Sequence, residues 1–454
     1  MQTRVLVPSG VLGLGFDPDA LARGVAANPD IIAIDGGSTD SGPFYLGTGT
    51  SKYSRSVCRD EWRQLLEARA TAGVPLVIGS CGTCGTAETV DWMFGITCEL
   101  AAELGQTLRV ARLYSDVPVE TLRVARDSGR LSPLHPAQTI DDAALEAMTN
   151  IVALAGAEQI QAAIHTGADV VLAGRATDTA TIAALPLARG AHSGAAWHGA
   201  KIAECGAFCT TRPASGVVMV TFDEAGFTVT PMGEGVRCTP QSVAAHMLYE
   251  NSDPWILYEP GGHLDVTAAT YTEAAQDGVR VVGAVWVAAG DYRVKLEGAR
   301  LVGYQTMMLA VIRDPRYVEA VVDWADLLLS HCRGLISASL GLQHDAYDID
   351  LRLIGVDAAL GHLERDRGSP VEVGVMLLIT ANEQTVASEI AAVINPYLLH
   401  FPLSDDEPLP TFAFPVSPGH SDRGAVYEFA LNHVLQLSDP MDGFLICVDE
   451  VGHG

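Results

Sequence analysis

Residues 1–200 alternate short apolar runs with segments of helical periodicity, and this alternation limits the possible folds more than any other feature of the sequence. The apolar runs are continuous, as in strands that are buried on both faces. Helices of about 10–15 residues separate them. Such a pattern predicts a mainly parallel sheet with helices on both faces. The predicted strands are Arg4–Val7, Asp30–Ile34, Pro75–Ile78, Leu108–Leu113 and Asp169–Ala173, and the predicted helices are Asp19–Ala27, Asp60–Ala72, Glu88–Leu104, Asp141–Ala155 and Gln159–Thr166.

Beyond residue 200 the pattern changes. Residues 212–305 are rich in alternating strand patterns, which predicts a β-rich insertion with a short helix at Pro240–Tyr249. A helix is predicted at Asp314–Leu329. From about Asp348 onwards two strands, a helix and a strand follow, an order that suits a ferredoxin-like α+β layer. The predicted strands are Gly216–Phe222, Phe227–Pro231, Val279–Val287, Tyr292–Leu296, Ile349–Gly355, Val371–Ile379 and Thr411–Pro415, and the last predicted helix is Gln384–Asn395.

The length of the chain predicts more than one domain. A single hydrophobic core stops growing at roughly 250–300 residues, whereas this chain has 454. We therefore expect an α/β core domain over residues 1–345, which includes the β-rich insertion. A smaller ferredoxin-like α+β domain is expected over residues 346–454.

The charge of the chain argues against several partners. Its 28 basic and 55 acidic residues give a net charge of −27, and proteins bind nucleic acids through clusters of Lys and Arg, so we expect no nucleic acid. The same charge repels anionic membranes, and no apolar run approaches the ~20 residues of a membrane helix. The N-terminus does not look like a signal peptide, and nine cysteines suit a reducing compartment. We expect a cytoplasmic protein that forms a homo-oligomer.

Polar loops follow three of the predicted parallel strands. In open α/β sheets, ligands bind outside the carboxyl ends of the strands, so a site is expected in these loops. The candidate residues are Asp35, Ser38, Thr39 and Asp40 in the first loop, Ser80, Gly82 and Thr83 in the glycine-rich second loop, and Arg175 and Asp178 in the third.

These loops offer complementary parts of a site for a small anionic substrate. Asp35 or Asp40 is the candidate general base. The amides of the turn at Gly79–Gly85 are the candidate oxyanion stabiliser, and Arg175 is the candidate clamp for a carboxylate or phosphate. The remaining polar residues of the loops would contact the substrate. Structural roles stay open as well: turn hydrogen bonds in the first loop, tight packing in the second, and a helix cap or an Arg175 pair for Asp178.

A further carboxylate, Glu204, lies in a helical stretch and is the third candidate catalytic residue. Lys201 precedes it by three residues, a spacing that equally suits an ion pair on the surface. Lys295 and Glu297 share one face of a strand and are most simply a surface pair. The turn Glu259–His263 combines a carboxylate with an imidazole and is a weaker candidate.

Cofactor signals are few. The C-x-x-C pair at Cys81 and Cys84 has neither a second pair for zinc nor a thioredoxin-like context. No H-E-x-x-H is present, so no metal ligands are assigned, and Mg²⁺ is the one ion that the candidate carboxylates suggest. The ordered G-x-G-x-x-G fingerprint is missing, so neither NAD nor flavin is expected.

Ordered motifs also connect the chain with a known family. Together they resemble the acyclic terpene utilisation (AtuA-like) family over nearly the whole chain. The family combines an α/β core with a ferredoxin-fold domain, and it occurs among genes for degrading branched terpenoid acids as CoA esters. Relatives have small residues where Cys81 and Cys84 stand. The motifs are D-G-G-S-T-D-S-G-P-F-Y-L-G (Asp35–Gly47), G-R-A-T-D-T-A (Gly174–Ala180), A-K-I-A-E-C-G (Ala200–Gly206), L-Y-E-N-S-D-P (Leu248–Pro254), Y-E-P-G-G (Tyr258–Gly262), V-K-L-E-G (Val294–Gly298) and Y-E-F-A-L-N-H-V-L (Tyr427–Leu435).

The sequence therefore predicts an enzyme of small-carboxylate or acyl-CoA catabolism. The expected reaction is that of a lyase, hydratase or isomerase acting next to a carbonyl. A hydrolase of a small acidic metabolite is the alternative enzyme, and a metabolite-binding or scaffold subunit without catalysis is the alternative outside enzymes. A scaffold predicts that Asp35, Asp40, Asp178 and Glu204 are all used in helix caps and Arg pairs, whereas catalysis predicts carboxylates that face a cleft.

Overall fold

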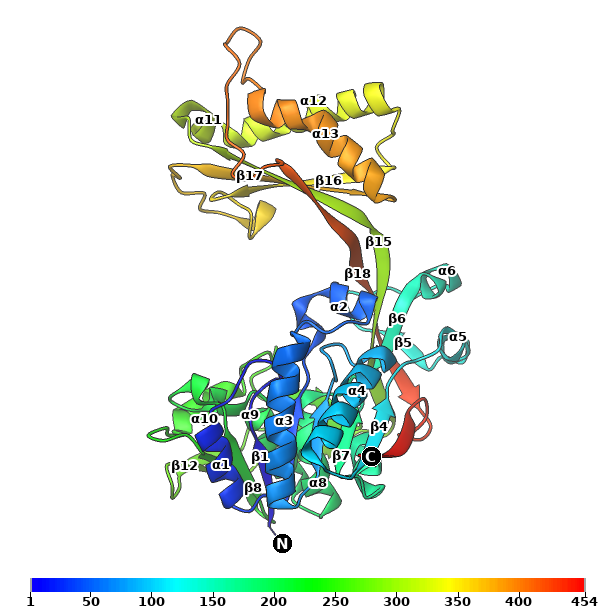
Figure 1. Ribbon diagram of the computed structural model, residues 1–454, viewed down its shortest axis with the longest axis vertical. Helices are drawn as coiled ribbons and strands as arrows, with labels where there is room; N and C mark the ends of the chain where they lie inside the picture. Colours follow the sequence, from blue (N-terminus) through cyan, green and yellow to red (C-terminus); the bar gives the residue numbers. More distant parts are fainter. Residues whose placement is uncertain (1, 453–454) are drawn as a thin grey trace. The chain divides into compact units, whose positions relative to one another are not determined.

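The computed structural model describes residues 2–452 and divides into two compact units (Figure 1). The first unit comprises Met1–Arg300 and Phe429–Gly454, and the second is Leu301–Glu428. These units differ from the ranges expected from the sequence, 1–345 and 346–454. The reason is that helix α12 (Val321–Leu340) packs with the strands that follow it and not with the parallel sheet.

A large mixed sheet forms the centre of the first unit. Its strand order is β12-β13-β9-β8-β1-β2-β3-β7-β4-β19. The five neighbours β1, β2, β3, β7 and β4 are parallel, and the other pairs are antiparallel. The expected α/β class is confirmed, but the sheet is mixed and not mainly parallel, because antiparallel strands flank its parallel strands on both sides. The strands are β1 (Thr3–Val7), β2 (Ile31–Asp35), β3 (Leu76–Gly79), β4 (Leu108–Tyr114), β7 (Val170–Ala173), β8 (Val218–Phe222), β9 (Gly226–Pro231), β12 (Thr270–Glu273), β13 (Val279–Val282) and β19 (Leu445–Val451).

Helices cover both faces of this sheet, because successive side chains of a strand point to opposite sides. Leu6 of β1 packs with α1, α3 and α4, whereas Val5 and Val7 pack with α7, α8 and α9. Figure 1 shows α3 and α4 side by side on one face. The helices are α1 (Pro18–Ala26), α3 (Arg55–Ala72), α4 (Ala87–Leu104), α7 (Ala157–His165), α8 (Asp178–Ala188) and α9 (Ser193–Ala203).

Smaller elements complete the first unit. A three-stranded sheet has the order β10-β11-β14, and short strands β5 and β6 pair with the long strands β18 and β15. These elements are α2 (Pro43–Thr48), α5 (Val119–Asp127), α6 (Asp142–Glu146), α10 (Pro240–His246), β5 (Leu131–Pro133), β6 (Met148–Ala153), β10 (Ile256–Glu259), β11 (Gly262–Asp265) and β14 (Val285–Ala288). The long strands β15 (Tyr292–Ile312) and β18 (His420–Leu437) each belong partly to the first unit and partly to the second.

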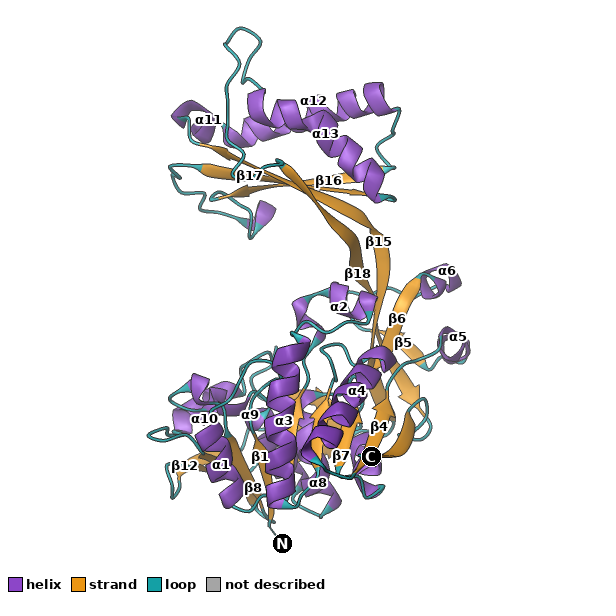
Figure 2. Cartoon of the chain, viewed as in Figure 1, coloured by secondary structure: helices purple, strands orange, loops and turns teal. Residues whose placement is uncertain are grey.

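The second unit is a smaller antiparallel sheet with helices on one side (Figure 2). Strand β17 (Val373–Ala381) pairs with β16 (Tyr347–Ile354) on one edge and with the second half of β15 on the other. Helices α12 and α13 (Gln384–His400) pack against this sheet and share one core with it, and α11 (Pro315–Glu319) precedes them.

Three expectations about elements need correction. The helix expected at Asp141–Ala155 ends at Glu146, and the β-branched stretch after it forms β6, which pairs with β15. The strand expected at Val279–Val287 is two strands in two sheets, because Gly283 turns the chain with a φ of 95°. The strand expected at Thr411–Pro415 is only an isolated bridge from Ala413 to Val311.

None of the helices within residues 2–452 combines the length and the apolar character that a membrane-spanning helix requires.

Candidate functional site

A pocket of about 560 Å³ lies where β1, β2, β3 and β7 end, and we call it the strand-end pocket. All three candidate loops contribute to its lining, as does the loop after β1. The structure thus brings together residues that are far apart in the sequence, as the common carboxyl edge of parallel strands requires. Candidate residues that line it are Asp35, Ser38, Asp40, Thr83 and Asp178, and further lining residues include Ser9, Gly10, Lys52, Cys205, Tyr249 and Glu250.

Asp35 ends strand β2 and is 7% exposed. Its Oδ2 accepts a hydrogen bond from the N–H of Gly37 at 2.8 Å, whereas its Oδ1 is buried without a hydrogen-bond partner among the described residues. Burial raises the pKa of Asp35 well above its ordinary value, the negative charge of Asp178 adds to this effect, and Arg175 opposes it. The raised pKa favours the protonated carboxyl group, and a perturbed carboxyl group at a pocket is a candidate for acid–base catalysis.

Arg175 is buried below the strand-end pocket and is not among the residues that line it. Its Nε donates to Oε2 of Glu297 at 3.0 Å, and its Nη1 donates to Oγ of Ser80 at 3.1 Å and to the carbonyl of Ala176 at 3.2 Å. The protein therefore holds Nε and Nη1 of the guanidinium. The structure does not bring Arg175 to the lining of the strand-end pocket, where a direct clamp on the substrate would lie.

Glu297 is the charged partner that holds the Arg175 guanidinium. Its carboxylate also accepts hydrogen bonds from Lys295 Nζ at 2.9 Å and from Thr39 Oγ1 at 3.0 Å. Burial alone would raise the pKa of Glu297, but the charges of Arg175 and Lys295 lower it to about 2. The pair Lys295 and Glu297 is therefore not the simple surface pair that the strand pattern suggested, since Glu297 is 6% exposed.

The glycine-rich turn after β3 uses most of its N–H groups within the protein and not as the expected oxyanion stabiliser. The N–H groups of Ser80, Cys81, Thr83 and Gly85 donate to the backbone carbonyls of Gly174, Ala173, Gly36 and Cys81, respectively. Ser80 is fully buried, and Gly82 does not line the pocket. The turn packs the loops together, which is the structural alternative for this motif. Only Thr83 of this turn reaches the strand-end pocket.

Asp178 is the first residue of α8, where the Thr177 hydroxyl caps the helix by accepting from the N–H of Ala180 at 3.2 Å. Its carboxylate lies 3.9 Å from Arg175, a distance too long for a hydrogen bond. Its partly buried position raises the pKa of Asp178; Arg175 opposes this shift and Asp40 adds to it. Asp178 is thus not the helix cap, and it forms the expected pair with Arg175 as an ion pair without a hydrogen bond.

Lys52 is the basic residue among those that line the strand-end pocket. Its Nζ donates to Oγ of Ser41 at 2.9 Å, and its backbone N–H donates to Oγ1 of Thr83 at 3.0 Å. The ammonium group also lies 5.6 Å from the centre of the Tyr53 ring. Because the side chain is exposed and donates one hydrogen bond, to a hydroxyl, it has donors left for an anion. Lys52 lies in the polar stretch G-T-S-K, where nothing in the sequence distinguishes it from a surface lysine.

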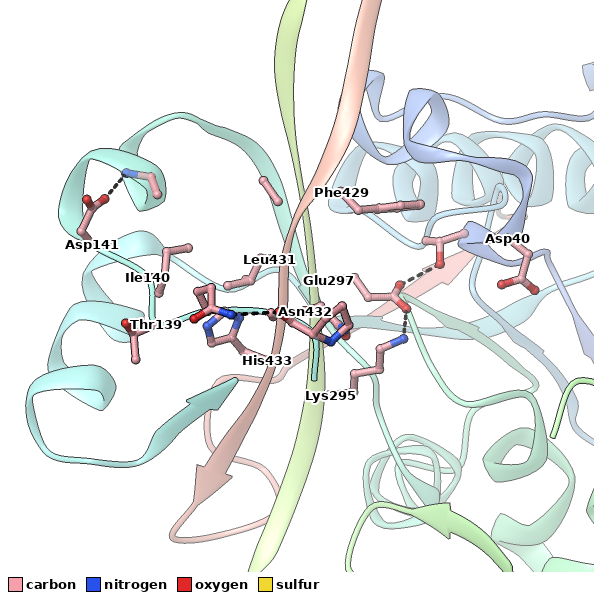
Figure 3. A pocket seen from close by; sticks show the side chains of 16 residues that line it. Asp40, Thr139, Ile140, Asp141, Lys295, Glu297, Phe429, Leu431, Asn432 and His433 are labelled. Atoms are coloured by element: carbon pink, nitrogen blue, oxygen red, sulfur yellow. Dashed lines mark hydrogen bonds and ion pairs between the residues drawn. The ribbon is translucent and has the colours of Figure 1, made fainter. Parts of the chain in front are cut away.

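A second pocket of about 660 Å³ is lined in part by Thr39 and Asp40 of the loop after β2. Figure 3 shows Glu297 and Lys295 of β15 beside this loop, with Asn432 and His433 of β18 along the same pocket. Asp40 lines both pockets, and its carboxylate accepts from the Ser38 hydroxyl at 2.7 Å. Thr39 thus donates to Glu297, whereas the neighbouring Asp40 faces the two pockets.

Glu204 lies at the end of α9, behind the strand-end pocket, and pairs with Lys201 as one reading of the sequence expected. The pair is buried and not on the surface. Lys201 also donates to the carbonyl of Tyr249 at 2.9 Å. Burial raises the pKa of Glu204 to about 8, with Lys201 opposing the shift and Asp178 adding to it.

The fold and the site together define the class: an α/β protein with a carboxylate-rich pocket at the ends of its parallel strands. Comparison with known families goes one step further. The family model described as acyclic terpene utilisation family protein AtuA matches residues 46–404. This match covers more than half of the chain, so the chain belongs to that family. Searches of curated proteins and of solved structures found no match.

Proposed function

We propose that this protein is an enzyme that moves a proton next to the carbonyl of a small carboxylate or acyl-CoA, as a lyase, hydratase or isomerase does. Membership of the family associates the chain with acyclic terpene utilisation, whose substrates are branched acids of this kind. The observation that carries the proposal is the state of Asp35: a buried carboxyl group at a pocket wall, with a raised pKa and one oxygen without a partner.

Asp35 would act as the acid–base group. Asp35 lines the pocket and the Gly37 amide orients its carboxyl group, which would take the proton from the carbon next to the carbonyl. The C–H bond breaks, and its electrons move toward the carbonyl oxygen. A base whose pKa lies near the working pH is efficient in this step. The proton then returns to a neighbouring atom or to a leaving group.

Lys52 would supply the positive charge that the substrate anion needs. Arg175 is less suited to this contact because it does not line the pocket and because Glu297 and Ser80 hold its Nε and Nη1. Lys52 lines the same pocket as Asp35 and Asp178 and keeps free donors. We therefore assign the anion contact of the proposed site to Lys52, and the polar contacts to Ser38 and Thr83.

A scaffold without catalysis is less well supported. It requires the four candidate carboxylates to be used up in caps and ion pairs. Glu204 pairs with Lys201, Asp178 lies at ion-pair distance from Arg175, and Asp40 accepts from the Ser38 hydroxyl. Asp35 alone among the four keeps a buried oxygen without a partner among the described residues. A buried group that lacks a partner weakens a fold, so its presence at a pocket favours a reaction.

The test compares the natural protein with Asp35→Asn. Branched acyclic carboxylic acids such as geranic acid, and their coenzyme A thioesters, are first screened for binding by thermal shift. Bound compounds are then incubated in D₂O, and deuterium uptake next to the carbonyl is followed by NMR. We expect Asp35→Asn to slow exchange by about 10²–10⁴-fold while the thermal shift persists. Asn can still accept from Gly37 and carries no buried charge, so its melting temperature should not fall.

The matched control is Asp60→Asn, which changes an exposed carboxylate on α3. It should exchange at the natural rate. Equal rates for Asp35→Asn and the control, or an absence of exchange with every compound that binds, would refute the proposal.

A further inference from the structure

Three potential metal ligands meet at one edge of the strand-end pocket. Glu204 and Cys205 follow the last turn of α9, and His246 is the last residue of α10. A carboxylate oxygen, the thiol sulfur and a ring nitrogen of these three side chains all lie within 4.8 Å of one another. Within residues 2–452 this is the one group of three or more His, Cys, Asp and Glu side chains that comes so close.

The state of His246 is a second and independent observation. Its side chain is 5% exposed, and its Nε2 is buried without any hydrogen-bond partner in the described part of the chain. Buried polar atoms in native proteins are nearly always satisfied, so such an atom requires an explanation. Its ring stacks on Tyr249 at 5.4 Å, which fixes the orientation of the imidazole.

We propose that Glu204, Cys205 and His246 bind a divalent transition-metal ion of the zinc class at the edge of the strand-end pocket. A thiolate, an imidazole and a carboxylate are the ligands that Zn²⁺ takes in proteins. Mg²⁺ prefers oxygen ligands only and would not choose a thiol. In a tetrahedral zinc site, sulfur and nitrogen ligands lie about 3.5 Å apart, so closing the site needs movements of roughly 1 Å.

Charges of both signs surround this point. Glu204 has Asp178 and Glu259 as negative neighbours, whereas the ammonium group of Lys201 acts on both Glu204 and His246, so the ion must bind beside a positive group. Lys201 contacts Oε1 of Glu204, which leaves Oε2 for the ion. Burial raises the pKa of the Cys205 thiol, so the ion must displace the thiol proton: the S–H bond breaks, the sulfur–metal bond forms and one proton is released.

The ion would be accessible from the pocket, because Cys205 belongs to its lining. Three protein ligands leave a fourth position of a tetrahedral ion open, which is the pattern of reactive zinc sites and not of purely structural ones. The metal site is argued from its own residues and does not depend on the acid–base role of Asp35.

The experiment uses the untagged full-length protein after treatment with a chelator. Co²⁺ is titrated into the protein, and the thiolate-to-cobalt charge-transfer absorption is followed, with Zn²⁺ used to displace it. We expect one equivalent of Co²⁺ per chain to produce the absorption. Cys205→Ser should abolish the absorption, and His246→Gln should weaken binding more than about 100-fold, beyond the loss seen for outer-shell changes.

The matched control is Cys98→Ser, since Cys98 is also a partly exposed free cysteine but lies on α4, away from the cluster. This variant should bind Co²⁺ like the natural protein. Far-ultraviolet circular dichroism of every variant confirms that it is folded, and Cys205→Ser, at the pocket surface, is the variant least disturbing to the core. No charge-transfer absorption in the natural protein, or an equal loss in Cys98→Ser, would overturn the metal site.

Discussion

Glu297 satisfies its two carboxylate oxygens with three partners, Arg175, Lys295 and Thr39. A buried ion pair contributes little net stability over an apolar replacement, but removing one partner alone is costly. The arrangement therefore fixes geometry more than it adds stability. It holds the loop after β2 against strand β15, and that loop carries Asp40 at the pocket edge.

The buried carboxyl group of Glu259 should make the stability of the protein depend on pH. Its Oε1 accepts from the Thr179 hydroxyl and its Oε2 is buried without a partner among residues 2–452. Burial raises the pKa of Glu259 from 4.5 to about 7, with Thr179 opposing the shift. The native state therefore keeps a proton that the unfolded chain loses above about pH 4.5. Its contribution to stability falls as pH rises toward 7, by at most about 1.4 kcal/mol per pH unit.

Glu259→Gln should remove this contribution to the change of unfolding free energy with pH. Gln can still accept from Thr179 but does not ionise, so the variant should gain stability over the natural protein as pH rises from 5 to 8. Urea unfolding at several pH values measures the difference. Glu273→Gln, at an exposed position of β12, is the control. Parallel profiles for the natural protein and Glu259→Gln would contradict the prediction.

At the residue scale, the sequence identified which loops line the pocket better than it identified what each residue in them contacts. Asp35 and Asp178 were predicted in the site and line the pocket. Arg175 was predicted to contact a substrate, but its partner Glu297 lies 122 residues away in the sequence. Such a distant pairing has no local signal, and neither has the approach of His246 to Cys205.

The glycine-rich turn after β3 shows how an element can be required by packing. Gly85 has a φ of 66°, and a Cβ atom there would lie 2.6 Å from Cα of Arg175. The N–H of Arg175 also donates to the carbonyl of Gly85 at 3.0 Å. Only a glycine lets the turn lie this close to the loop that follows β7.

Gly85→Ala should therefore cost more stability than its backbone conformation alone explains. Gly105 is the control, since it has a φ of 62° but nothing within 4 Å of the position of a Cβ atom. We expect Gly105→Ala to cost about 1 kcal/mol and Gly85→Ala about 1–3 kcal/mol more, because of overpacking. Urea unfolding of both variants gives the two values. Equal values would show that the loops can move apart freely.

At the element scale, the parallel strands were predictable, whereas the antiparallel strands β6 and β18 were not. Continuous apolar runs such as Ile31–Asp35 mark strands that are buried on both faces. Strands β6 and β18 are polar or only half-buried, and their partners lie far away in the sequence. Their apolar residues recur at spacings that also fit a helix, which explains the incorrect helix at Asp141–Ala155.

At the scale of the whole molecule, each compact unit has a core of its own. Trp324, Leu377 and Ile390 belong to a cluster that lies entirely within Leu301–Glu428. The sequence predicted two domains from chain length but placed the boundary at 345–346. The second half of β15 and helix α12 belong to the later unit through contacts that a local pattern does not show.

A fragment of residues 301–428 should therefore fold by itself. It contains all three strands and both long helices of the second core. We expect a cooperative urea transition and a helical circular dichroism spectrum. A fragment of residues 346–428 lacks α12 and the β15 strand, so it should show no cooperative transition. The division into units fails if the shorter fragment folds as well as the longer one.

The carboxylates around the strand-end pocket also govern how fast a ligand arrives. An anionic metabolite approaches a molecule of net charge −27 and meets Asp40, Asp178 and Glu250 around the single ammonium of Lys52. Repulsion at long range slows such encounters, and dissolved ions weaken it over roughly 8–10 Å at physiological ionic strength. Added salt should thus speed the capture of an anion by this protein, the reverse of what a basic binding cleft shows.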